Sequence, residues 1–274
     1  MAVFVGLFVV PNAMNFAYPF TNWSAFHPDV RYVGLDNLRT IWHDGSLKQA
    51  VGTTLKYAVM VAVFQNLGGL GLALLLERDS KLNRLLRTMF FLPVLLSALA
   101  VGYIFQALLA QNGALNATLS HVVGHQVTTA WLGSTTWTIV VVALIHAWKW
   151  VGLTMLVYLA GLKSIPSDVL EAASLDGASR WRALVSVRLP LMAPAITFNV
   201  ATSVLGSMNS FDIVQATTGG GPAESTQIFN VYMFRIFGQG LYAQAAAMSL
   251  VLFFVVVVVA VPLVTYLRRR ELQL

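Results

Sequence analysis

The chain has no cysteine and little charge: Asp, Glu, Lys and Arg make up 10% of its 274 residues. The absence of cysteine excludes disulfide bonds and cysteine-ligated metal sites. The low charge excludes an ordinary water-soluble domain, in which about a quarter of the residues are charged. Because 57% of the residues are hydrophobic, most of the protein surface is expected to face a lipid bilayer.

Long apolar runs predict six membrane-spanning helices, since a bilayer needs roughly 20 apolar residues per helical span. The runs are continuous, which argues against the alternating pattern of a membrane β-barrel. We therefore expect an all-α integral membrane fold in which residues 1–274 form one transmembrane domain. The predicted spans are 1–20, 50–76, 88–110, 135–162, 191–214 and 242–267.

The distribution of Lys and Arg predicts the orientation of the chain. Basic residues gather in segments 77–87 and 163–190 and after residue 267, and short basic segments stay on the cytoplasmic side. Both termini are then cytoplasmic, in a multi-pass protein of a bacterial or archaeal plasma (inner) membrane. The outward-facing segments are expected to be 21–49, 111–134 and 215–241.

The first predicted span is unusual because it begins without a basic leader and is interrupted by Pro11, Asn12 and Asn15. A short first span and a missing N-terminal piece both explain this pattern. A cleaved signal peptide is disfavoured, since such peptides carry a charged beginning.

The densest polar patch lies between two apolar runs, at EAASLDGASRWRALVSVRLPLMAP, residues 171–194. Ser167 is a candidate N-cap for a short helix over 167–175. Gly177 is expected to end that helix, and a second one is expected from about Ser179 to Val187. A helix–turn–helix of this kind is shaped to dock into the groove of another protein. The alternative is an interfacial amphipathic loop without a partner.

This patch carries a family resemblance. The run Glu171-Ala172-Ala173, then Asp176-Gly177-Ala178, then Leu189-Pro190, resembles the EAA loop of permeases in binding-protein-dependent ABC importers. Leu184 and Val187 replace the aromatic residue and the isoleucine that are usual there, and both keep an apolar contact. The resemblance implies that this loop couples an ATPase subunit to the membrane helices. The coupling residues would be Glu171, Ala172, Ala173, Asp176 and Gly177.

Further stretches are similar to the carbohydrate-uptake branch of that family, near the first-type maltose and glycerol-3-phosphate permeases. They are FTNW (20–23), VGLDNL (33–38), RTMFFLP (87–93) and TTGGGP (217–222). The resemblance implies import of a sugar, oligosaccharide or polyol. It also implies a second homologous permease, two ATPase subunits and an extracytoplasmic solute-binding protein, and no nucleic-acid partner.

The chain itself is expected to be no enzyme and to hold no cofactor. TTGGGP lacks the Gly-Lys-Ser/Thr ending of a phosphate-binding loop, so ATP and magnesium would be bound by the partner ATPase. One alternative is the same importer class acting on glycerol-3-phosphate, glycerophosphodiesters or peptides. Another is a standalone secondary transporter. An intramembrane enzyme is disfavoured, because no paired carboxylates or histidine clusters occur at helical spacing.

Small and polar residues recur every three or four positions in the fifth predicted span, which places them along one helix face. This pattern suits close helix packing or the lining of a pathway for a hydroxylated solute. The residues are Asn199, Ser203, Gly206, Ser207 and Ser210. Resemblance to the maltose permease implies sugar contacts at Ser203, Gly206, Ser207 and Ser210.

The fourth predicted span contains Lys149, and a lysine inside a membrane is costly unless it faces protein or water. It could pair with Asp212, meet an anionic solute or extend to the interface. The resemblance implies sugar contacts at Lys149, Trp150 and Leu153. His146 is expected to be a packed core residue, and no metal site is indicated. Asn209 and Asp212 are possible residues of the outer pathway.

Overall fold

The structure is a computed structural model that describes residues 1–27 and 29–271. Within these ranges it is helical, with two isolated β-bridges and no strand. This confirms the all-α prediction. Among the described residues, three helices are long and apolar enough to cross a membrane, and the number is five if each of two bent helix pairs is one span.

The bundle is built on the three long helices, which are α4 (Ser46–Leu75), α8 (Thr138–Lys163) and α15 (Tyr242–Glu271). The most extensive helix contact is between α4 and α8. The helix that contains Phe90 also packs closely on α8 at Gly152. A Cβ at Gly152 would lie 2.1 Å from the Phe90 carbonyl oxygen, so only glycine fits there. Small residues at helix contacts allow this kind of packing in membranes.

The predicted span 88–110 is wrong as one straight helix. It consists of α5 (Lys81–Leu95) and α6 (Ala98–Leu108), which bend by 99°. Pro93 lacks a backbone N–H and disfavours helix continuation around it, and Leu96 adopts an extended conformation. Segment 77–87 is also mostly helical, because the Ser80 hydroxyl accepts a bond from the Asn83 N–H (3.1 Å) and starts α5 there.

The predicted span 191–214 is wrong at its outer end. The helix that crosses this region, α12 (Ala193–Met208), stops six residues early, and α13 (Asp212–Thr217) follows a break. Three short pieces precede α12, and they meet it at a bend of 72°. They are α10 (Arg180–Ala183), η3 (Leu184–Arg188) and α11 (Leu189–Leu191).

The first predicted span is helical from Ala2 to Phe20 but is divided into four successive pieces. They are α1 (Ala2–Phe4), η1 (Val5–Val9), α2 (Val10–Ala17) and η2 (Tyr18–Phe20). Phe16 packs edge-on against Phe253 of α15, at 5.6 Å between ring centroids. Before it, large apolar side chains are exposed, and Leu7 is 78% exposed. Whether this stretch is a sixth span stays a prediction.

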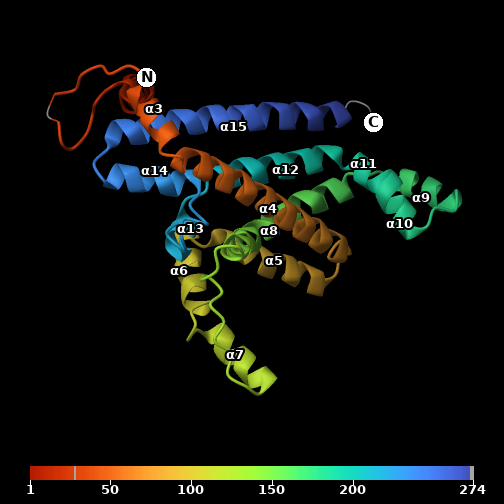
Figure 1. The fold of residues 1–274 in the computed structure, drawn as a ribbon. Helices are drawn as coiled ribbons and strands as arrows, with labels where there is room; N and C mark the ends of the chain where they lie inside the picture. The colour runs from red at the N-terminus through yellow and green to blue at the C-terminus, as the bar shows by residue number, and fades with distance from the viewer. Residues whose placement is uncertain (28, 272–274) are drawn as a thin grey trace.

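The remaining helices lie at the two ends of the bundle (Figure 1). One end holds α3 (Asp36–His43) and α14 (Phe229–Gly238), and α7 (Ala114–Val123) projects from the molecule beyond α6. The opposite end holds α9 (Ser167–Leu175), α10 and the C-terminal end of α15. The predicted docking segment is therefore at the opposite end from the predicted outer segments 21–49 and 215–241, whereas α7 of segment 111–134 projects sideways.

Candidate functional site

A cavity of about 220 Å³, here called the central cavity, lies between α4, α8 and α12 and is open on one side, where Phe198 is 56% exposed. Its wall combines amide, hydroxyl and imidazole side chains with one indole ring and two apolar side chains. None of its described lining residues is Asp, Glu, Lys or Arg. The lining comprises Gln65, His146, Trp150, Leu153, Thr154, Phe198, Asn199, Thr202, Ser203 and Gly206.

Hydrogen bonds join the three helices around this cavity. Asn66 of α4 donates to the Ser203 hydroxyl (2.9 Å) and accepts from the Tyr158 hydroxyl (2.6 Å). Gln65 donates to the Thr154 hydroxyl at 2.8 Å. Because polar groups in a membrane interior must find partners within the protein, these bonds fix how the three helices face one another.

Four of the predicted pathway residues line the cavity, namely Ser203, Gly206, Trp150 and Leu153. Ser207 does not line it: its side chain is fully buried, and its hydroxyl donates to the Ser203 carbonyl oxygen at 2.7 Å. Ser210 lies beyond the end of α12, where its carbonyl oxygen accepts from the Asn230 amide (3.2 Å). The residues that the sequence places on one helix face therefore have three environments. Ser203 and Gly206 line the cavity, Ser207 is packed, and Ser210 lies in the helix break.

Lys149 does not pair with Asp212, and this proposed ion pair is wrong. The Lys149 ammonium donates to the Val94 carbonyl oxygen at 3.1 Å and lies 4.3 Å from the centroid of the Trp150 ring. The Val94 carbonyl is available because the α5–α6 break follows it and the helix does not continue. Asp212 is exposed at the start of α13, and Asn209 is exposed in the preceding break.

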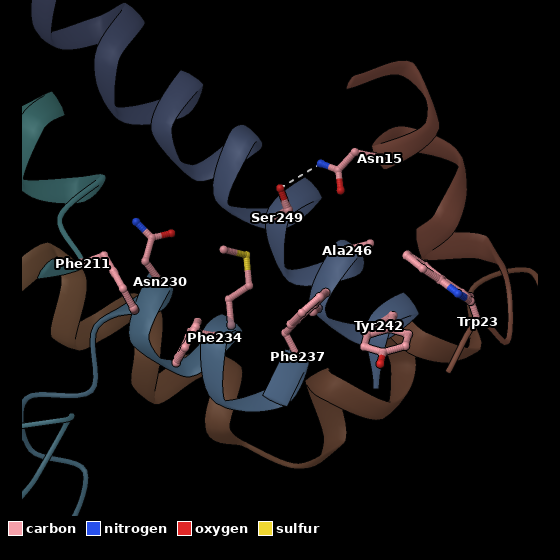
Figure 2. Close-up of a pocket in the computed structure, with 11 residues that line it drawn as sticks. Asn15, Trp23, Phe211, Asn230, Phe234, Phe237, Tyr242, Ala246 and Ser249 are labelled. Carbon is pink, nitrogen blue, oxygen red and sulfur yellow. Dashed lines mark hydrogen bonds between the residues drawn. The ribbon is translucent and has the colours of Figure 1, made fainter. Parts of the chain in front are cut away.

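A second cavity, of about 410 Å³, opens near the end of the bundle that holds α3 and α14, between α14, α15 and the first helical stretch. Figure 2 shows the Asn15–Ser249 hydrogen bond (3.0 Å) at one edge and Trp23 with Tyr242 at another. Aromatic rings dominate its wall, and Phe211 lies against Phe234 at 5.1 Å between ring centroids. None of the predicted pathway residues lines this cavity.

A third, more polar cavity of about 340 Å³ lies at the same end, between α3, α14 and the start of α15. Arg235 pairs with Glu224 at 2.7 Å, and the Tyr232 hydroxyl donates to Asp44 at 3.2 Å. Burial raises the pKa of Tyr232 above its ordinary value. The hydroxyl therefore stays protonated and remains a donor near neutral pH.

The predicted docking segment has the expected order of short helices. α9 covers Ser167–Leu175, as predicted, but Pro166 takes the N-cap position that was expected for Ser167. Ser179 caps α10, since its hydroxyl accepts from the Arg182 N–H (3.3 Å).

A glycine-dependent motif ends α9. Gly177 has a φ of +75°, its N–H donates to the Ser174 carbonyl (3.1 Å), and the Ala178 N–H donates to the Ala173 carbonyl (3.0 Å). This is the Schellman arrangement, which places glycine at the left-handed position. Glu171, Ala172, Asp176 and Gly177 are exposed and Ala173 is half-buried. The five predicted coupling residues thus stay together on one solvent-facing turn.

An ion pair holds the second part of this segment against α4. The Arg188 guanidinium contacts the Glu77 carboxylate, with both side chains largely covered. Glu77 follows the end of α4, where Arg87 of α5 donates to the Leu76 carbonyl oxygen (3.0 Å) and the Arg78 carbonyl oxygen (3.1 Å). Basic side chains at a helix C-terminus satisfy its free carbonyls in this way.

Comparison with known proteins identifies the family. Residues 65–271 match the family described as binding-protein-dependent transport system inner membrane component. The chain belongs to this family. Like other binding-protein-dependent inner membrane components, it is a transport permease rather than an enzyme, and its apolar helices are those of an inner-membrane protein.

Curated relatives of this inner membrane component match along most of their length. The probable starch degradation products transport system permease protein AmyD of Thermoanaerobacterium thermosulfurigenes is 30% identical, over 97% of this chain and 90% of its own. The multiple sugar-binding transport system permease protein MsmF of Streptococcus mutans is 31% identical, over 94% and 88%. The sn-glycerol-3-phosphate transport system permease protein UgpA of Escherichia coli is 30% identical, over 95% and 88%.

A solved structure has the same fold. The bacterial alginate ABC transporter, in complex with a periplasmic protein that holds an alginate pentasaccharide, superposes with a TM-score of 0.80 at 22% identity. The match covers 98% of this chain and 92% of the other. The likeness shows a shared fold along nearly the whole chain.

Sequence reasoning missed the contribution of α4 to the cavity. Gln65 and Asn66 lie in the middle of a 30-residue apolar helix, and two adjacent amides there were the available signal. A buried amide in lipid is costly unless it is bonded. Thr154 and Tyr158 were also missed, because their hydrogen-bond partners Gln65 and Asn66 lie on a different helix.

Proposed function

We propose that this chain is the permease subunit of an ATP-driven importer for a neutral sugar, oligosaccharide or polyol. The observation that carries the proposal is the lining of the central cavity. Asn199, Ser203 and Thr202 offer hydrogen-bonding groups, and Trp150 offers a flat apolar ring. Sites for small molecules combine apolar and aromatic walls with a few placed polar groups.

The absence of ionised groups from the described cavity lining favours a neutral solute over glycerol-3-phosphate. A phosphate is bound by Arg, Lys or a cluster of backbone N–H groups, and Lys149 instead points to the Val94 carbonyl. Two of the relatives are described as permeases for starch degradation products and for multiple sugars. The relative described as a glycerol-3-phosphate permease makes that solute the second candidate.

The importer would need partners to complete its pathway and its energy supply. A second homologous permease would cover the open side of the α8–α12 cavity. An ATPase would receive the exposed turn at Glu171 to Gly177, and would bind the ATP and magnesium. A solute-binding protein would dock on segments 21–49 and 215–241 at the opposite end. Closure of two ATPase subunits would then move the docking segments and open the cavity outward.

Uptake measurements test the solute class. Cells that lack the gene, with and without a plasmid copy, would be given labelled maltose, lactose, raffinose and sn-glycerol-3-phosphate. We expect plasmid-dependent uptake of at least one of the neutral sugars. Plasmid-dependent uptake of sn-glycerol-3-phosphate alone would show that the neutral-solute assignment is wrong.

Purification of the tagged chain from native membranes tests the partners. We expect an ATPase, a second permease and a solute-binding protein to be retained with it. A stable homo-oligomer without an ATPase would instead support a secondary transporter.

A further inference from the structure

The amide of Gln65 is the unexplained polar group of the central cavity. The residue lines the cavity and is 7% exposed, in the middle of α4. Its nitrogen donates to the Thr154 hydroxyl at 2.8 Å, while its oxygen is buried and accepts no hydrogen bond from any described residue. Exchanging the amide nitrogen and oxygen would leave the nitrogen open instead. In either orientation, one polar atom is unused.

The adjacent amide of Asn66 differs from that of Gln65 because both of its polar atoms are hydrogen-bonded. Its nitrogen donates to the Ala62 carbonyl (2.8 Å) and the Ser203 hydroxyl (2.9 Å), and its oxygen accepts from Tyr158. The two neighbours therefore have different tasks. Asn66 holds α4, α8 and α12 together, whereas Gln65 contributes only one bond to that network.

An unsatisfied buried amide oxygen is destabilising, so removing the amide costs the fold the single bond to Thr154 but also removes the unsatisfied atom. A glutamine kept at such a place is explained by a partner that is present only during transport. The nearest space for that partner is the cavity that Gln65 lines. A hydroxyl group fits best, because it donates to the open amide oxygen in the present orientation and accepts from the nitrogen in the flipped one.

We propose that Gln65 is a specificity-determining residue, whose side-chain amide hydrogen-bonds a hydroxyl group of the transported solute in the cavity between α4, α8 and α12. This inference rests on the proposed sugar or polyol substrate. It adds α4 to the solute-contacting helices, beside α8 and α12. It also assigns the two adjacent amides separate functions, one for recognition and one for the fold.

The substitution Gln65→Met tests the proposal, since methionine has a similar shape and no amide. The probe is whichever of labelled maltose, lactose or raffinose the unsubstituted protein takes up. Loss of one hydrogen bond predicts a fall in uptake efficiency at low solute of about three- to tenfold. The Tm of the purified complex should change little, because loss of the bond to Thr154 is offset by removal of the unsatisfied amide oxygen. Gln65→Leu is a second variant with the same expectations.

The matched control is Asn66→Leu, which removes three hydrogen bonds, two of which join α4 to α8 and α12. It should lower the Tm of the complex, whereas Gln65→Met should not. Normal uptake efficiency by Gln65→Met would overturn the proposal and leave a water molecule as the partner. A fall in uptake that is matched by a fall in Tm would show a structural role instead. If the unsubstituted protein imports none of the sugars, the proposed function fails, and that result is separate from the behaviour of Gln65.

Discussion

At the scale of single residues, helical spacing predicted which side chains share a region but not which of them reach the cavity. Ser203, Gly206 and Ser207 follow one another along α12, yet Ser203 and Gly206 line the cavity while Ser207 is buried in packing. The rotation of α12 is set by the bonds to Asn66 and Thr154 on other helices. Those contacts join positions far apart in the chain, so no local pattern contains them.

This difference gives a paired prediction at adjacent positions. A Cβ at Gly206 would meet no atom within 4 Å, so Gly206→Leu should extend into the cavity and block solute without disturbing the fold. We expect uptake to fall by at least about tenfold, which corresponds to the loss of about 1.4 kcal/mol of binding, with normal amounts of the protein in the membrane.

Ser207→Leu is the control for this prediction, because it places the same side chain into a packed region. Overpacking costs about 1–3 kcal/mol, so this variant should accumulate poorly and have a lower Tm. The two variants are compared by sugar uptake and by immunoblots of membranes. Normal uptake by Gly206→Leu would show that solute does not pass through this cavity.

At the scale of elements, signals confined to a few neighbouring residues were read correctly. The helix at 167–175, its end at Gly177 and the start of α10 follow from one glycine and one serine. The breaks after Leu95 and Met208 were missed, although Pro93 was a signal for the first. The apolar run continues past this proline, so hydropathy alone does not locate the break. The second break has no comparable signal, since Asn209 and Ser210 also occur within helices.

The Schellman turn at Gly177 supports a prediction about docking. Gly177→Leu forces a branched side chain into the left-handed region, at a cost of about 1–2 kcal/mol, and should displace the exposed turn of α9. We expect sugar uptake to be lost while the chain still inserts into membranes. The measurement is uptake together with the amount of ATPase that is retained on purification.

Gly124 provides the matched control, because its φ of +77° is nearly the same and a Cβ there also meets no atom within 4 Å. It ends α7, far from the docking segment. Gly124→Leu should bear similar backbone strain yet retain the ATPase. Equal loss of the ATPase from both variants would mean that the effect is general destabilisation.

The Glu77–Arg188 pair predicts a charge-swap result. Arg188→Glu places two carboxylates together where both side chains are largely covered. A charge-assisted hydrogen bond of this kind contributes about 1.5–3 kcal/mol. Arg188→Glu and Glu77→Arg should each lower both the Tm of the complex and its uptake rate. The double variant should recover a substantial part of each loss, because it restores opposite charges. Additive losses in the double variant would exclude a direct interaction between these side chains.

At the scale of the whole molecule, composition was sufficient to predict a helical membrane protein, and the motifs were sufficient to place it in its family. The long helices are buried to different extents: in the most apolar stretch of each helix, 56% of α8 is buried, against 17% of α15. A chain that folded alone in lipid would still need apolar outer faces. The exposed faces are therefore consistent with both lipid and a second permease, and composition does not separate the two.

Orientation in the membrane is the property that Lys and Arg predict for the whole chain, and the absence of cysteine makes it directly measurable. Single cysteines at Val122 of α7, which is 79% exposed, and at Leu175 of α9, which is 89% exposed, would report on a predicted outer segment and on the predicted docking segment. The basic docking segment should lie in the cytoplasm. A membrane-impermeant maleimide should therefore label Val122→Cys in intact cells and Leu175→Cys only after the membrane is opened.

The same labelling decides the place of the first helical stretch. If residues 1–20 cross the bilayer, a cysteine at the exposed Val3 should be protected in intact cells, like the one at Leu175. The parent chain carries no thiol, so it is the control for background labelling. Labelling of Val3→Cys in intact cells would place the N-terminus outside and leave five spans. Labelling of Leu175→Cys in intact cells would reverse the orientation altogether, and an ATPase in the cytoplasm could then not reach the Glu171 turn.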